Sequence, residues 1–390
     1  MLSSLRLRYL DKYNMFNSGS SSPLTEMPYS RSTSPLSNRR KSRFYTCLYI
    51  ALAITLFFAA FVYTPLPSHH LTDHRDAFVS QLKDNIPTTA SPRPAGGHSH
   101  GASPSLNSTT SANAYATFFA SSDSRIEEDK YFAAVRILAY QLLHAPETRT
   151  TNNYPFIVLV TSTIPEDKRE RLRRDGAIVL EATPIDAGWI KTEISTWQNV
   201  MTKLRLWEFT QFERICFVDA DTVLVKPLDS IFDEPAVATR TTLPNPDALM
   251  ADEAPMPPSY VFAGVVEMKK EHHYPPLEDE YANINYLNAG FFILQPSLTL
   301  FDYYISLTTT PNRFVPHLPE QNLLNYAHRR EGNMAWQQLD TKWNIHYPTT
   351  DDLKGGVASL HDKWWSPVNE NMGPYLASWR WRMEGFWEGR

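Results

Sequence analysis

Cysteine is scarce in this 390-residue chain, and so is any surplus of basic residues. Cys47 and Cys216 are its two cysteines, which are too few for a disulfide framework or a thiolate metal site. The formal net charge is -5, from 37 lysines and arginines against 42 aspartates and glutamates, without a clustered basic surface. We therefore expect no nucleic-acid partner and a fold that is stabilised by packing.

One long apolar run, at residues 44–64, is the clearest local feature of the sequence. The segment FYTCLYIALAITLFFAAFVYT carries no charge and has the length of a helix that crosses a bilayer. A basic cluster at 39–43 precedes it and no comparable cluster follows, so the positive-inside rule places the N-terminus in the cytoplasm. A cleaved signal peptide is the alternative, but the run starts late and lacks a small-residue cleavage motif. We expect a single-pass type II membrane anchor.

The segments on both sides of this run have the composition of flexible chain. Residues 1–43 are rich in Ser, Pro, Tyr and Arg without periodicity, which predicts a disordered cytoplasmic tail. Residues 65–112 are rich in Pro, Ser, Thr, His and Gly, which predicts a flexible lumenal stem. Asn107-Ser108-Thr109 in that stem is an N-glycosylation sequon if the stem faces the lumen.

From residue 113 onwards, apolar runs alternate with amphipathic helical patterns, as is typical of an α/β domain. We expect one helix around Phe132 to Leu142, a charged helix running to Arg174 and a third helix at about 196–209. The expected strands are 115–120, 156–160, 177–180 and 214–218. This order predicts a Rossmann-like nucleotide-binding half, in which ligands bind at the carboxyl ends of the strands.

The triplet Asp219-Ala220-Asp221 follows the last of these strands. Two unpaired carboxylates at the end of an apolar strand would be costly to remove from water. A divalent cation would offset that cost, and carboxylate oxygens suit Mg²⁺ and Mn²⁺, which bridge protein carboxylates to substrate phosphates. Aspartates are also common as turn or cap residues at strand ends, so the triplet alone leaves both interpretations open.

The sequence around the triplet resembles glycosyltransferase family 8, the glycogenin-like retaining transferases. The likeness is collinear over 113–368, and its motifs are TKLRLW at 202–207, FVDADTVLVKPLDSIF at 217–232, YLNAGFFILQPS at 286–297, PEQNLLN at 319–325, Trp343-Asn344 and LHDKWW at 360–365. The resemblance implies a GT-A domain at 113–390, with a Rossmann-like nucleotide-binding half and a mixed central sheet.

The resemblance also implies roles for individual residues. Asp219, Asp221 and His361 would ligate the metal, with Mn²⁺ favoured over Mg²⁺ because imidazole is softer than carboxylate. A UDP-sugar would be the donor. The implied donor-binding residues are Ala120, Ser121, Ser122 and Tyr131 at the uridine and Lys203, Asp219, Ala220, Asp221 and Lys363 at the diphosphate, while Lys203, Asn288, Glu320 and Gln321 would be the catalytic residues.

Two positions depart from the family. Only Asp362 separates His361 from Lys363, where the family usually has several residues, so Asp362 is an alternative cap for this loop and the role of Lys363 depends on the loop's path. Glu320 stands where glycogenin-like members have Asp.

We expect retaining transfer of a hexose or N-acetylhexosamine from the UDP-sugar to a glycan acceptor in the Golgi lumen. Similarity to fungal Golgi N-acetylglucosaminyltransferases favours a glycan acceptor over self-glucosylation, and a homodimer is compatible with the sequence. Front-face displacement is favoured over a covalent intermediate on Glu320. The alternatives are an inverting GT-A enzyme of another family, with Asp279 or Glu280 as general base, and a catalytically silent Golgi scaffold.

Three further features carry weaker expectations. The long, proline-rich stretch at 229–284 is a candidate acceptor-binding loop. His272 and His273 within it are expected to be solvated, because adjacent residues seldom point to one metal. The aromatic and arginine-rich stretch at 379–387 is expected to pack as a final helix over the domain, with an acceptor platform as the alternative.

Overall fold

The computed structural model describes residues 112–120, 129–185, 187–190 and 199–389. The predicted tail, anchor at 44–64, stem and Asn107 sequon lie outside these residues, and so do Ser121 and Ser122. Within the described part of the chain, no helix is both long enough and apolar enough to cross a membrane.

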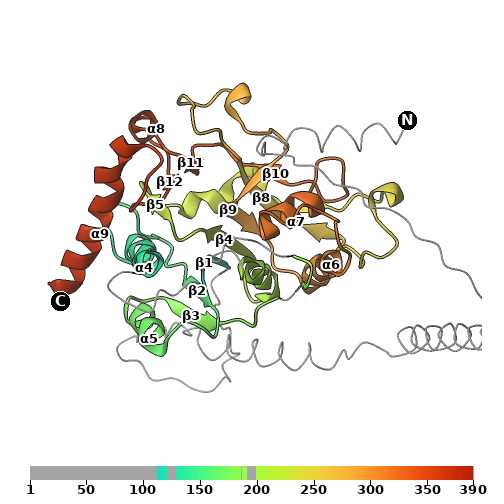
Figure 1. The fold of residues 1–390 in the computed structure, drawn as a ribbon, viewed down its shortest axis with the longest axis horizontal. Helices are drawn as coiled ribbons and strands as arrows, with labels where there is room; N and C mark the ends of the chain where they lie inside the picture. The colour runs from blue at the N-terminus through green and yellow to red at the C-terminus, as the bar shows by residue number, and fades with distance from the viewer. Residues whose placement is uncertain (1–111, 121–128, 186, 191–198, 390) are drawn as a thin grey trace, which may run out of the picture. The chain divides into compact units, whose positions relative to one another are not determined.

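A seven-stranded mixed sheet forms the centre of the domain (Figure 1). Strands β8, β4, β1, β2, β3 and β10 run in one direction, and β9 runs against its neighbours β4 and β8. The expected α/β architecture with a mixed central sheet is therefore confirmed. In spatial order the strands are β10 (Gln337–Gln338), β8 (Phe262–Val266), β9 (Leu287–Leu294), β4 (Arg214–Val218), β1 (Asn113–Phe119), β2 (Phe156–Val160) and β3 (Ile178–Glu181).

Helices cover both faces of this sheet, which explains why its strands are nearly continuous apolar runs. Alternate residues of β1 enter different cores: Ala114 and Ala116 pack in one with Trp207, and Tyr115 packs in the other with Leu138. The first core includes the 3-10 helix η3 (Val200–Glu208), α6 (Leu298–Thr309) and α7 (Pro319–Ala327), and the second includes α4 (Lys130–Leu143) and α5 (Glu166–Arg174).

A smaller three-stranded sheet lies beside the end of β4. Strand β5 (Thr222–Leu224) pairs antiparallel with β12 (Ser359–His361), which pairs parallel with β11 (Ile345–His346). This sheet brings the C-terminal part of the chain next to residues 219–221. The remaining elements are β6 (Arg240–Thr241), β7 (Ser259–Tyr260), α8 (Thr350–Gly355), α9 (Gly373–Glu388) and the 3-10 helices η4 (Asp229–Asp233), η5 (Pro235–Val237), η6 (Pro246–Ala248), η7 (Glu278–Glu280) and η8 (Glu370–Met372).

Helix α9 packs over the domain, as the sequence predicted. Its Leu376 and Trp379 are buried in a third core with Ile137 and Tyr140 of α4. Trp381 on the same helix keeps 64% of its surface exposed. The aromatic density of this segment therefore contributes mainly to packing.

Three sequence expectations need correction. The helix expected at 196–209 is the 3-10 helix η3, and 196–198 lie outside the described residues. Most side chains of η3 itself are buried, including that of Lys203, so the helix has no broad exposed face that would reveal its period. The spacing of apolar residues therefore could not distinguish three residues per turn from 3.6. The helix expected around Phe132 to Leu142 is α4, which begins two residues earlier, at Lys130, because the Asp129 carboxylate accepts the amide of Phe132 as its N-cap. The stretch at 229–284 is not one loop, since it supplies β8 to the central sheet.

Candidate active site

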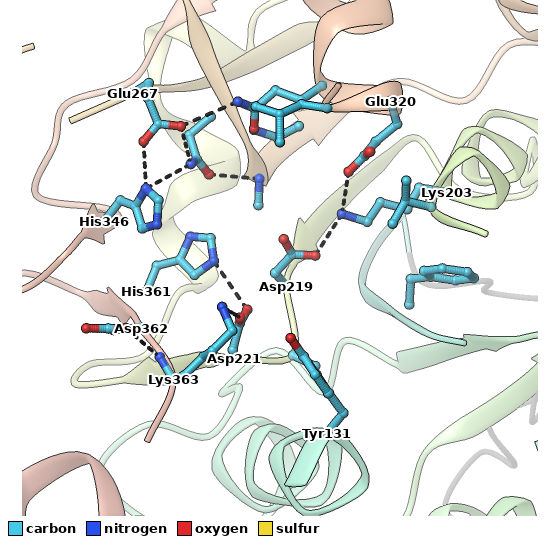
Figure 2. A pocket seen from close by; sticks show the side chains of 18 of the residues that line it. Tyr131, Lys203, Asp219, Asp221, Glu267, Glu320, His346, His361, Asp362 and Lys363 are labelled. Atoms are coloured by element: carbon cyan, nitrogen blue, oxygen red, sulfur yellow. Dashed lines mark hydrogen bonds and ion pairs between the residues drawn. The ribbon is translucent and has the colours of Figure 1, made fainter. Parts of the chain in front are cut away.

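A pocket of about 380 Å³ opens where β1 and β4 end and β5, β11 and β12 approach them. Every described residue to which the family resemblance assigns a role lines this pocket. They are Ala120, Tyr131, Lys203, Asp219, Ala220, Asp221, Asn288, Glu320, Gln321, His361 and Lys363. Figure 2 shows how the polar side chains among them converge from separate elements.

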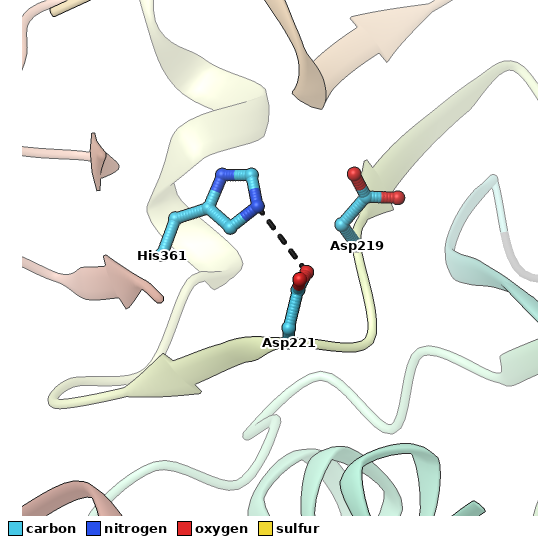
Figure 3. A group of neighbouring side chains, drawn as sticks. All are labelled: Asp219, Asp221 and His361. Carbon is cyan, nitrogen blue, oxygen red and sulfur yellow. Dashed lines mark ion pairs between the residues drawn. The ribbon is translucent and has the colours of Figure 1, made fainter. Parts of the chain in front are cut away.

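Asp219, Asp221 and His361 form a compact group of ligand atoms (Figure 3). One oxygen of each carboxylate and one ring nitrogen of His361 lie within 4.8 Å of one another. The register of β5 and β12 pairs His361 with Thr222, and this places the imidazole Nε2 3.2 Å from Asp221 Oδ1. Two carboxylate oxygens and an imidazole nitrogen suit Mn²⁺, so the donor set fits the implied metal.

The space between these ligands depends on Gly290 of β9. A Cβ at this position would lie 2.2 Å from His361 Cε1 and 2.9 Å from Asp219 Oδ2. The backbone is fixed here, since the Asp219 amide donates to the Gly290 carbonyl at 2.7 Å. A glycine is therefore required for strand β9 to approach the metal-ligand group.

Lys203 of η3 is a buried cation beside the same group. Its Nζ lies 2.9 Å from Asp219 Oδ1 and 2.9 Å from Glu320 Oε1. Burial alone would lower the pKa of Lys203, but the two carboxylates raise it above its ordinary value. The side chain therefore stays an ammonium and links the triplet to α7.

The two aspartates of the triplet have different environments. Burial raises the pKa of Asp219 despite the neighbouring Lys203. Burial would also raise the pKa of Asp221, but the hydrogen bond from His361 and the charge of Lys363 hold it below its usual range. Asp221 is therefore the more firmly ionised of the two.

Sequence reasoning missed several polar residues of the pocket, and Glu267 and His346 are the two among them that bond to the predicted residues. Glu267 Oε1 lies 2.6 Å from His346 Nδ1, and its Oε2 accepts the Asn288 amide at 2.8 Å and the Gln321 amide at 3.4 Å. Glu267 directly follows the apolar strand β8, just as Asp219 follows β4, and this signal could have identified it. His346 joins the site through its pairing with His361 across β11 and β12, which the sequence does not display.

The shortened spacing between His361 and Lys363 is accommodated by Asp362. Its carboxylate accepts the amides of Lys363 and Val368, each at 2.7 Å, so Asp362 caps the loop as one alternative predicted. Lys363 Nζ still lies 3.4 Å from Asp221 Oδ2, with 45% of its side chain exposed.

Tyr131 occupies the α4 side of the pocket, where the resemblance implies the uridine. The Trp365 ring meets the Tyr131 ring edge-on at a centroid distance of 4.9 Å. This contact fixes the orientation of the phenol ring, and Ala120, which follows β1, lines the same pocket.

The candidate general bases and histidines of the 229–284 stretch lie outside this pocket. Asp279 and Glu280 belong to η7, where Glu280 pairs with His273, and neither is among the residues that line the pocket. The expectation of solvated histidines is wrong for His272, whose buried ring lies 3.1 Å from Asp352 Oδ2. It holds for His273, which is 83% exposed, and the two rings do not share a centre.

Comparisons with known proteins give relatives but no family model that matches the chain. An uncharacterized protein of Schizosaccharomyces pombe is 31% identical over 284 residues, covering 65% of this chain and 74% of that protein. Galactinol synthase 3 of Arabidopsis thaliana is 27% identical over 181 residues, covering 45% of this chain and 52% of that protein. Among solved structures, the galactosyltransferase LgtC with donor and acceptor sugar analogs covers 68% of this chain and 95% of that chain, with 16% identity and a TM-score of 0.41.

Proposed function

The chain belongs to the family 8-like glycosyltransferases, and we propose that it is a retaining, Mn²⁺-dependent enzyme that uses a UDP-sugar. The observation that carries the proposal is the convergence of Asp219, Asp221 and His361, from distant parts of the chain, at the end of β4. The transferred sugar would be a hexose or N-acetylhexosamine, and the acceptor a glycan. The apolar run at 44–64 supports a type II anchor, which would place the catalytic domain in the Golgi lumen.

The pocket residues divide the work of binding and transfer. Asp219, Asp221 and His361 would hold a divalent cation, and this cation would supply positive charge to a departing diphosphate. Lys203, fixed between Asp219 and Glu320, adds a second positive charge on the η3 side. The half-exposed Lys363 can turn from Asp221 toward a phosphate oxygen.

The donor sugar would meet the amides of Asn288 and Gln321. Glu267 accepts a hydrogen bond from each of them, and the Gln321 side-chain oxygen accepts the Ala289 amide at 2.9 Å. These contacts hold the two side chains in place before the donor binds, which lowers the entropy cost of orienting the sugar hydroxyls.

Hydrolysis of UDP-sugars tests the proposed function. The full chain, purified in a mild detergent, is expected to hydrolyse at least one of UDP-glucose, UDP-galactose and UDP-N-acetylglucosamine slowly, because water substitutes for the acceptor. EDTA should abolish the release of UDP, and Mn²⁺ should restore it more fully than Mg²⁺. Absence of turnover and of binding with every donor would favour the silent scaffold, and an inverted product anomer would favour the other GT-A class.

The mechanism of retention has its own test in Glu320→Gln. Glu320 is committed to an ion pair with Lys203, which lowers its nucleophilicity, and glutamine keeps an oxygen for that contact. We therefore expect kcat to fall by less than about 10-fold, since only part of one charged contact is lost. Loss of turnover by about 10⁴-fold or more would instead indicate a covalent intermediate on Glu320. Rapid-quench kinetics with the most active donor would measure the chemical step.

A further inference from the structure

Tyr347 has a strained backbone. Its φ is 60°, and among the described residues the other positive φ values belong to asparagines and glycines. In this left-handed region the Cβ of an ordinary residue crowds its own backbone, whereas asparagine and glycine tolerate the conformation. An aromatic residue is therefore a costly choice at this position, and such strain is concentrated at functional sites.

A stack of rings holds Tyr347 in place. Its ring lies 3.7 Å, centroid to centroid, from the His346 imidazole at an interplanar angle of 21°. The His346 ring in turn stacks on His361 at 4.8 Å and 25°. Since Glu267 contacts His346, the position of the phenol is coupled through His346 to the metal-ligand group.

Tyr347 lines the pocket on the side of His346. In Figure 2, His346 and Glu267 lie on the other side of Asp219 from Lys203, which is assigned to the departing diphosphate. The phenol hydroxyl of Tyr347 can donate and accept a hydrogen bond. The ring and hydroxyl thus offer an apolar surface and a polar group next to His346 and Glu267, which contact the proposed donor-sugar residue Asn288. An acceptor hydroxyl must approach the donor sugar from such a neighbouring position to reach its anomeric carbon.

We propose that Tyr347 binds the acceptor, and that its ring packs against the C–H face of a neutral pyranose while its hydroxyl meets a sugar hydroxyl. This inference rests on the proposed function. In the transfer, the bond from the anomeric carbon to the phosphate oxygen breaks, and a bond to the acceptor oxygen forms. The acceptor proton passes to the departing UDP.

The experiment compares Tyr347→Gly, Tyr347→Phe and Lys270→Ala in the full chain. Glycine adopts the observed φ without strain, so Tyr347→Gly should keep the loop conformation and a near-normal unfolding temperature. Lys270→Ala is the matched control, because it removes a neighbouring side chain, whose Nζ lies over the Tyr347 ring at 5.9 Å from the centroid, and leaves Tyr347 itself in place. The probes are methyl glucoside, methyl galactoside, methyl mannoside and lactose, each assayed alongside hydrolysis of the same UDP-sugar.

Tyr347→Gly is expected to raise the acceptor KM by about 10-fold or more, while donor KM and hydrolysis change by less than about 3-fold. Tyr347→Phe should retain most transfer, and Lys270→Ala all of it. A parallel loss of hydrolysis and transfer in Tyr347→Gly would overturn the inference, because the ring would then only support His346 and His361. Normal hydrolysis with transfer to none of the four sugars would also overturn it. A wild-type chain that turns over no donor would instead refute the proposed function itself.

Discussion

Asp221→Asn is expected to lower UDP-sugar turnover by about 10³-fold, because metal stabilisation of a departing diphosphate contributes several kcal/mol. Asparagine keeps the shape of the side chain but removes the charge that faces His361 Nε2 at 3.2 Å and Lys363 Nζ at 3.4 Å. The fold should survive, since Asp221 contacts the site and not a hydrophobic core. The measurements are initial rates of UDP release and the rise in unfolding temperature on adding Mn²⁺, which should disappear in the variant.

Asp351→Asn is the matched control for this substitution. Asp351 is 73% exposed on α8 and pairs with Lys354, so its loss should change neither turnover nor the Mn²⁺ effect. If Asp221→Asn kept both near-wild-type turnover and the Mn²⁺-induced rise, Asp221 would not be a ligand. The triplet would then be a turn at the end of β4, the alternative that its sequence left open.

Sequence patterns located the strands well where burial on both faces made them apolar throughout. The expected strands at 156–160 and 214–218 coincide with β2 and β4, and the predicted strand at 115–120 differs from β1 by two residues at its start and one at its end. The position of Asp219 could be predicted for the same reason, because the residue that follows a buried parallel strand lies at the carboxyl end of the sheet.

Residues that join the site through tertiary pairing were harder to predict. His346 is placed by the parallel register of β11 and β12, and two-residue strands leave no periodicity to detect. Glu267 was missed for a different reason. The prolines of residues 229–284 predicted an acceptor-binding loop, and β8, which Glu267 follows, lies within that stretch. His272 shows the same limit: a buried ion pair with Asp352, 80 positions away, cannot be inferred from two adjacent histidines.

The metal-ligand group and the Glu267 network are connected through β9. Asn288 Oδ1 accepts the Gly290 amide at 2.9 Å while its Nδ2 donates to Glu267, so one side chain links the metal side of the pocket to the proposed sugar side. Lys203 makes a second link, from Asp219 to Glu320 on α7. The site is therefore held by side chains that contact each other, and a small displacement at its centre should affect metal and donor binding together.

Gly290→Ala applies that displacement directly. The added methyl would lie 2.2 Å from His361 Cε1 and 2.9 Å from both Asp219 Oδ2 and Asn288 Oδ1. None of these neighbours can move freely: His361 is stacked on His346, Asp219 is paired with Lys203, and Asn288 is bound to Glu267. We expect turnover to fall by about 10²-fold or more, as misplacement of catalytic groups by about 1 Å can cost that much. The apparent Mn²⁺ affinity, measured by titrating UDP release, should fall with it.

Gly385→Ala on α9 separates this steric effect from the general effect of adding a methyl group. Apart from its two chain neighbours and the nearby backbone of its own helix, a Cβ added at Gly385 would have no heavy atom within 4 Å. Alanine is also a better helix former than glycine. The control should therefore keep its turnover and gain slightly in unfolding temperature. If Gly290→Ala matched the control in both turnover and Mn²⁺ response, β9 could retreat from the ligands at little cost. The geometry of the metal site would then depend on β4, β5 and β12, because Asp219 follows β4, Asp221 precedes β5 and His361 ends β12.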